Sequence, residues 1–181
     1  MKHINNFHQF RINENILVKD NKIKTYEKLL INSVISFMKI KLNFDAKIIV
    51  KKKQSTNLLG DIQINDNSVN NNKFTLFFNS NQSYIQIIKS LIHELTHIKQ
   101  VSKGELKPSG DYKFIIWKDN FTMNVKEYYK LGKDIEKYKN LPWESEAYSN
   151  MNIFYDEYIN SNLWKDLKGV DNNLDFIIDN I

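Results

Sequence analysis

Apolar residues recur at helical spacing in two long stretches of the chain. The first stretch predicts a helix over residues 24–41. The second begins after Ser83, which forms a capping box with Gln86, and it ends at Gly104, a typical residue after a helix end. Their apolar positions are Ile23, Tyr26, Leu29, Leu30, Ile35, Phe37 and Met38, and then Ile85, Ile88, Leu91, Ile92, Leu95 and Ile98. Each helix is therefore expected to pack one face on a core.

Between the two helices, short apolar runs bounded by polar turns predict strands over 46–53, 61–66 and 73–80, and residues 10–18 are also strand-like. The chain contains no internal repeat and no linker that would divide it, so one α+β domain is expected over 1–181. We expect a small, mostly antiparallel sheet, packed on the helix after Ser83 and on a later helix.

The later helix is predicted at Pro142, a residue that suits the first turn, and it continues through "WESEAYSNMNIFYDEYI". Before it, residues 111–119 and 120–128 predict a hairpin. After it, the tail 161–181 holds enough apolar residues for one or two short packed helices.

The amino-acid composition excludes several classes of protein and of functional site. Hydrophobic residues make up 41% of the 181 positions, which excludes disorder, and no apolar run approaches the roughly 18 residues of a membrane span. The polar N-terminal segment has no apolar signal region, so we expect a cytoplasmic protein. Cysteine is absent, which excludes disulfides and thiolate chemistry and leaves His, Asp and Glu as the strong metal ligands.

The net charge is +5, and the one compact basic run is "KIIVKKK" at 47–53. A solvated, lysine-rich strand edge is the favoured interpretation of this run. A nucleic-acid surface is the weaker alternative.

The most specific pattern is "HELTH" at 93–97, on the predicted helix after Ser83. Positions 93 and 97 differ by about 40° around a helix and by one turn, so both imidazoles can reach one ion. Glu94 lies beside them, where a general base can reach a water activated by a metal. Alternatively, these polar residues only solvate a core helix, but two of the four histidines in the chain at metal-ligand spacing favour the metal site.

A catalytic zinc ion usually takes three protein ligands, and no histidine follows His97. Gln100 and Lys103 occupy the positions where an HExxHxxGxxH pattern needs Gly and His, which excludes that pattern. The third ligand is therefore expected to be a downstream carboxylate. Glu144 and Glu146 are the strongest candidates because they lie in the first turn of the helix at Pro142, about 200° apart, so that only one can be the ligand.

"HELTHIKQ" followed by "LPWESEA" resembles the small zinc metallopeptidases of phage and mobile-element genomes, which are similar to minimal gluzincins. The resemblance covers roughly residues 57–160 and implies a zincin-like core there, with 1–56 as an N-terminal helix and strand. Aligning Ala147 with the alanine of the family's ExxA(D/N) pattern selects Glu144 as the zinc ligand, with Glu146 as runner-up. Tyr148 departs from that pattern, in which an Asp or Asn would support a histidine.

The resemblance also implies that the strand before the active-site helix, at 73–80, lies at the sheet edge and binds an extended peptide. For Tyr148 two roles stay open: its hydroxyl orients a ligand or binds the oxyanion, or its ring only packs. The expected function is a zinc-dependent peptidase acting on peptides or proteins, in the host cytoplasm if phage-encoded. The alternative is a non-catalytic, zinc-stabilised binding protein that engages DNA or a host or phage protein, with His3 or His8 as a fourth ligand.

Overall fold

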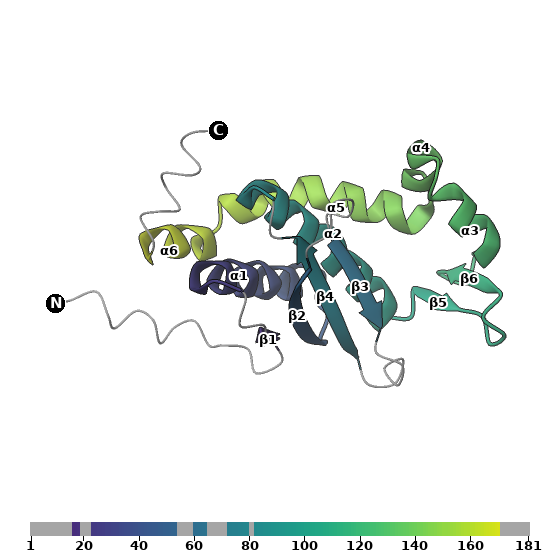
Figure 1. The fold of residues 1–181 in the computed structure, drawn as a ribbon, viewed down its shortest axis with the longest axis horizontal. Coiled ribbons are helices and arrows are strands. Elements are labelled where there is room, and N and C mark those ends of the chain that lie inside the picture. The colour runs from purple at the N-terminus through teal and green to yellow at the C-terminus, as the bar shows by residue number, and fades with distance from the viewer. Residues whose placement is uncertain (1–15, 19–22, 54–59, 65–71, 80–81, 171–181) are drawn as a thin grey trace.

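The computed structural model describes residues 16–18, 23–53, 60–64, 72–79 and 82–170 of the chain (Figure 1). The strands are β1 (Ile16–Val18), β2 (Lys47–Lys53), β3 (Gly60–Ile64), β4 (Lys73–Asn79), β5 (Leu106–Pro108), β6 (Phe114–Trp117) and β7 (Phe121–Asn124). The helices are α1 (Thr25–Leu42), α2 (Tyr84–Ser102), α3 (Val125–Leu131), α4 (Ile135–Lys139), α5 (Pro142–Ile159) and α6 (Asn162–Val170).

Four strands form the main sheet, in the order β1-β2-β4-β3. β1 and β4 pair with β2 in parallel, whereas β3 pairs with β4 in the antiparallel direction. Two expectations about this sheet are therefore wrong. The sheet is mixed rather than mostly antiparallel, and β4, at 73–79, is an inner strand rather than the edge. β3 is the strand at that edge of the described sheet, because β4, which follows β3 in the chain, inserts between β2 and β3.

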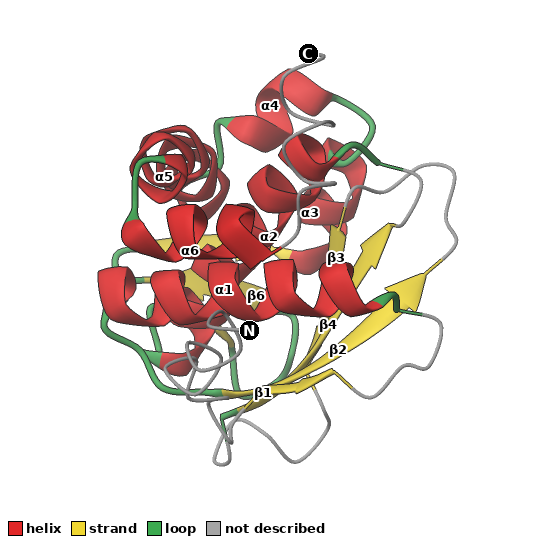
Figure 2. Cartoon of the chain, turned by 90° about the vertical axis from the view of Figure 1, so that its left-hand side faces the viewer, coloured by secondary structure: helices red, strands yellow, loops and turns green. Residues whose placement is uncertain are grey.

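The described helices gather on one side of this sheet (Figure 2). Alternate residues of β2 and β4, such as Ile48, Val50, Phe74 and Leu76, are buried there together with the apolar stripes of α1 and α2. The burial of both stripes confirms the predicted amphipathic helices. The main core therefore lies between the sheet and α1 and α2.

Helix α2 has the predicted ends. The side chain of Ser83 accepts from the backbone of Gln86, and the Gln86 side chain accepts from the backbone of Ser83. At the other end Gly104 has φ 69°, a left-handed conformation that favours glycine. It lets the next backbone amide, of Glu105, donate to the carbonyl of Gln100.

Helix α5 begins at Pro142, as predicted, and packs along α2. It is anchored on α1 by Tyr158, which is fully buried and donates a hydrogen bond of 2.9 Å to Ser33. In the tail only α6 is described, and its Trp164 and Leu167 are buried in the main core.

Strands β5, β6 and β7 form a second, antiparallel sheet, which lies with α3 and α4 at one end of the molecule (Figure 1). A smaller core of Trp117, Leu141 and Trp143 holds this part together. The predicted hairpin is shorter than expected, because residues 125–128 begin α3 after an Asn124 cap. Helices α3 and α4 are too short to show a helical period in the sequence.

Candidate metal centre

Three side chains from two helices meet where α2 passes the first turn of α5. His93 and His97 lie one turn apart on α2, and their Nε2 atoms are 3.1 Å apart. Glu144 of α5 is 2% exposed, and its Oε2 lies 3.4 Å from each of these two Nε2 atoms. Among the described residues this is the group of His, Cys, Asp or Glu side chains whose spacing suits a metal ion.

The spacing of these atoms can be compared with what zinc needs. Two ligand atoms that each lie ~2.0–2.1 Å from a tetrahedral ion are about 3.3–3.4 Å apart. The two distances to Glu144, 3.4 Å each, match this requirement, and the Nε2–Nε2 distance of 3.1 Å is slightly shorter than it. Two imidazoles and one carboxylate also make a usual donor set for catalytic zinc. The residues therefore fit the ion that the sequence implies.

The electrostatics of the cluster favour a charged carboxylate. Burial alone would raise the pKa of Glu144, but the two imidazoles against it outweigh burial and hold its pKa at about 2. Burial alone would lower the pKa of His97, yet the Glu144 carboxylate outweighs burial and raises that pKa above its usual 6.5. The negative charge of Glu144 thus favours positive charge beside it, and a metal cation held by these three side chains would supply that charge.

Glu94 is half-buried on the same helix and does not belong to the three-atom cluster. Its negative charge acts on His97 and on Tyr148, and it helps to raise the pKa of each. His93, His97 and Glu144 provide the three atoms of the cluster, and Glu94 lies on the same helix outside it. A general base would need a position of this kind, beside the ligands and not among them.

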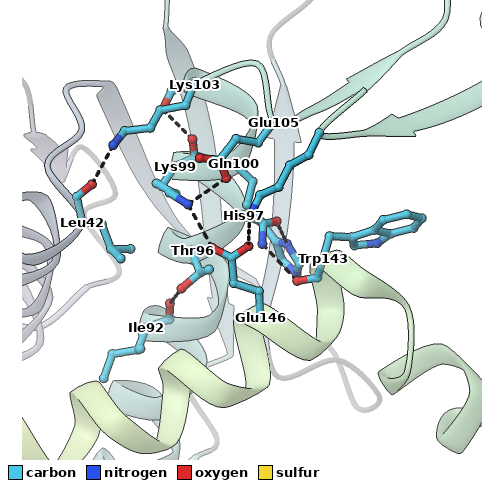
Figure 3. A network of polar contacts seen from close by, with 12 residues as sticks. Leu42, Ile92, Thr96, His97, Lys99, Gln100, Lys103, Glu105, Trp143 and Glu146 are labelled. Carbon is cyan, nitrogen blue, oxygen red and sulfur yellow. Dashed lines mark hydrogen bonds and ion pairs between the residues drawn. The ribbon is translucent and has the colours of Figure 1, made fainter. Parts of the chain in front are cut away.

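Glu146, the alternative ligand, points away from the cluster. One of its carboxylate oxygens lies 2.9 Å from Lys99 (Figure 3), and the other lies 3.2 Å from Lys118. Lys99 also contacts Glu105 at 2.7 Å, so this group of charges joins α2, α5 and the start of the second sheet. Two positions along a helix rotate a side chain by about 200°, and docking of α5 with Glu144 inward necessarily turns Glu146 outward.

Tyr148 packs its ring on His93, with 4.6 Å between the ring centroids. Burial, and then the charges of Glu144 and Glu94, raise the pKa of its hydroxyl. The ring therefore does pack against a ligand candidate, and its hydroxyl stays protonated at neutral pH. The buried Trp143 and Trp117 belong to the smaller core, where they pack with its other apolar residues.

Two residues beside the cluster were not expected. The Tyr138 hydroxyl lies 3.3 Å from the Tyr128 hydroxyl, and burial together with the negative charge of Glu144 raises its pKa. No sequence signal marks Tyr138, because it belongs to the five-residue α4. Gln100 is fully buried and contacts His97. Its spacing of three residues from His97, which places both side chains on one face of α2, is the sequence signal that marks it.

Within the described ranges no fourth side chain of these types joins the cluster. His3 and His8 lie outside the described residues, and so does most of the predicted strand 10–18. Of the basic run, Lys52 contacts the buried Glu27, at 3.2 Å, while Lys47 and Lys51 are exposed.

Comparison of the chain with protein-family models, with curated proteins and with solved structures gave no match. None of the helices in the described part of the chain combines the length and the apolar character that crossing a bilayer requires.

Proposed function

We propose that this protein is a zinc-dependent peptidase of the zincin type, in which His93, His97 and Glu144 hold the metal and Glu94 is the general base. The observation that carries the proposal is the triangle formed by two Nε2 atoms and one oxygen of a buried carboxylate, with sides of 3.1, 3.4 and 3.4 Å. Glu94 favours hydrolysis in particular. A carboxylate that lies beside the ligands without being one of them can act as a base on water.

A zinc ion bound there would supply a Lewis acid that acidifies water and polarises a carbonyl group. Glu94 accepts the proton of the attacking water and then delivers it to the nitrogen of the leaving amine. Because its pKa is raised, the Tyr148 hydroxyl keeps its proton and can donate to the carbonyl oxygen as negative charge develops.

The substrate class follows from the sheet. β3 is an edge strand that contacts α2, the helix of the ligand histidines. In the described sheet β3 pairs with β4 on one side only, and an extended peptide that paired with its other side would run along the strand that contacts α2. We therefore propose peptides or unfolded protein segments as substrates.

Replacement of Glu94 by Gln tests the role of the base. The substitution keeps the size of the side chain and leaves His93, His97 and Glu144 in place, so zinc content should stay at about one ion per chain. Hydrolysis should fall by roughly 10²–10⁴-fold, the usual contribution of a general base. Cleavage is followed by mass spectrometry on a mixture of unstructured peptides, with the protein loaded with zinc.

The matched control is Glu127→Gln, the same chemical change on an exposed residue of α3. It should cleave like the unmodified protein. Equal activity of Glu94→Gln and this control would refute the role of Glu94. Zinc binding with no cleavage by any form would instead favour the non-catalytic, zinc-stabilised binding protein.

A further inference from the structure

Gln100 links the two helices that carry the candidate ligands. It lies three residues after His97 on α2, and its side chain is fully buried. Its Oε1 lies 2.8 Å from Nδ1 of His97, and its Nε2 lies 3.0 Å from the backbone oxygen of Trp143 (Figure 3). Trp143 directly precedes Glu144 on α5. One buried amide therefore contacts one candidate ligand and the backbone next to another.

The direction of these two hydrogen bonds follows from their chemistry. The oxygen of Trp143 can only accept, so the NH₂ group of Gln100 must face it and donate. The amide oxygen of Gln100 then faces His97, and Nδ1 of that ring must carry the proton that it accepts. In the neutral ring this leaves the lone pair on Nε2. Nε2 is the atom that lies in the cluster with Glu144.

The two histidines differ in this respect. Nδ1 of His93 is buried and has no hydrogen-bond partner among the described residues. The ring of His93 instead packs on Tyr148, where the ExxA(D/N) pattern would place a polar residue. Among the described contacts, His97 is the histidine whose Nδ1 has a hydrogen-bond partner, and that partner, Gln100, lies on the same helix.

We infer that Gln100 is a positioning residue for the metal: it holds His97 in the tautomer that presents Nε2, and it fixes α2 against the first turn of α5 beside Glu144. The inference rests on the proposed zinc site, although it does not depend on peptide hydrolysis. Partners that hold metal-bound histidines in this way typically contribute 10–100-fold to metal affinity.

Two substitutions separate the roles of the amide. Gln100→Met has a similar, unbranched shape but can neither accept from His97 nor donate to Trp143. Gln100→Glu keeps an acceptor for His97 and loses the donor to Trp143. The matched control is Thr96→Val, because Thr96 is also fully buried on α2 and its hydroxyl donates only within the helix, to Ile92 at 2.9 Å (Figure 3).

Zinc affinity is measured on the full chain by competition with a chromogenic chelator, and the zinc-loaded protein is examined by proton NMR for the exchange-protected Nδ1–H of His97. Gln100→Met should bind zinc roughly 10–100-fold more weakly and lose this resonance. Gln100→Glu should keep the resonance, move it downfield because the acceptor is charged, and bind zinc more tightly than Gln100→Met. Thr96→Val should bind zinc like the unmodified protein.

Equal zinc affinity of Gln100→Met and the unmodified protein would overturn the inference. If Gln100→Met does not fold, Gln100→Glu decides, and loss of the Nδ1–H resonance in that variant would overturn it equally. Tight zinc binding that depends on Gln100, in a protein that cleaves no peptide, would leave the inference standing and refute the peptidase. An unmodified protein that binds no zinc would refute both.

Discussion

The choice between Glu144 and Glu146 gives the sharpest test of the metal centre. The two residues belong to one turn of α5, and replacing either by Gln removes one negative charge at nearly constant volume. Their surroundings differ, because Glu144 is 2% exposed against two imidazoles whereas the Glu146 side chain is 24% exposed between two lysines. The two variants should therefore change different properties.

Glu146→Gln should affect stability alone. Partly exposed ion pairs contribute about 0.2–1 kcal/mol each, so the loss of the pairs with Lys99 and Lys118 should lower the free energy of unfolding by about 1 kcal/mol. For a chain of this length that corresponds to roughly 2–4 °C in Tm. Lys99 keeps Glu105 as a partner, and zinc affinity should not change.

Glu144→Gln should affect zinc binding. Loss of a ligand should weaken zinc affinity by at least the 10–100-fold that loss of a ligand's supporting partner costs. At free zinc about 1,000 times the Kd of the unmodified protein, binding stabilises the fold by about 4.1 kcal/mol. A 100-fold weaker site leaves about 1.4 kcal/mol under the same conditions. The rise of Tm with zinc should accordingly shrink from about 8–16 °C to about 3–6 °C.

The assay is thermal unfolding of the three proteins by circular dichroism, with buffered zinc and with EDTA, together with zinc content by elemental analysis. A normal zinc-dependent rise of Tm in Glu144→Gln would refute its assignment as a ligand. Loss of that rise in Glu146→Gln would show that the other carboxylate binds the metal.

Two further predictions concern the zinc-free protein. Because the pKa of His97 is raised above 6.5 in the folded chain, its contribution to stability is complete below that pH and is lost as the pH rises through the raised pKa. The pKa of Glu144, lowered to about 2, gives a contribution that is present above about 4.5 and lost as the pH falls toward 2. Urea unfolding in EDTA is compared at pH 8 and at pH 6. On lowering the pH, the free energy of unfolding of the unmodified protein should rise by up to ~1.4 kcal/mol per pH unit relative to that of Glu144→Gln. An identical pH response of the two proteins would contradict an interaction between His97 and Glu144. Separately, Tyr158→Phe should lower the free energy of unfolding by about 1–3 kcal/mol, because the buried Ser33 hydroxyl loses its donor, while zinc affinity stays unchanged. Tyr155→Phe, on the partly exposed face of the same helix, is its control, and an equal loss of stability in both variants would argue against the buried hydrogen bond.

The spacing of His93, Glu94 and His97 could be recognised in the sequence because the geometry of one helix is local. The capping box at Ser83, the left-handed Gly104 and Pro142 at the start of α5 mark element ends for the same reason. These signals depend only on neighbours within a few residues. They determined that two imidazoles can share an ion, and that Glu144 and Glu146 diverge around their helix.

Which glutamate meets the histidines was decided by the tertiary structure. Residues on α2 and α5 that touch are far apart in sequence, by 43 positions in the hydrogen bond from Gln100 to Trp143, and the rotation of α5 is fixed by what it buries. Trp143 and Ala147 turn inward with Glu144, and Tyr158 anchors the far end of the helix on α1. Helical spacing relates residues within one helix and carries no information about how a second helix is rotated against it.

The order of the strands has the same origin. The alternation of apolar residues located β2, β3 and β4 along the chain, but it left open that β4, the last of the three, inserts between β2 and β3. Pairing partners are chosen by loops and by the burial of whole faces, so an edge is a property of the assembled sheet. The sequence by itself determined the helix of the metal motif and its two histidines. The packing of the folded chain decided which glutamate joins them, how Gln100 connects the two helices and which strand lies at the sheet edge, because each depends on contacts between segments far apart in sequence.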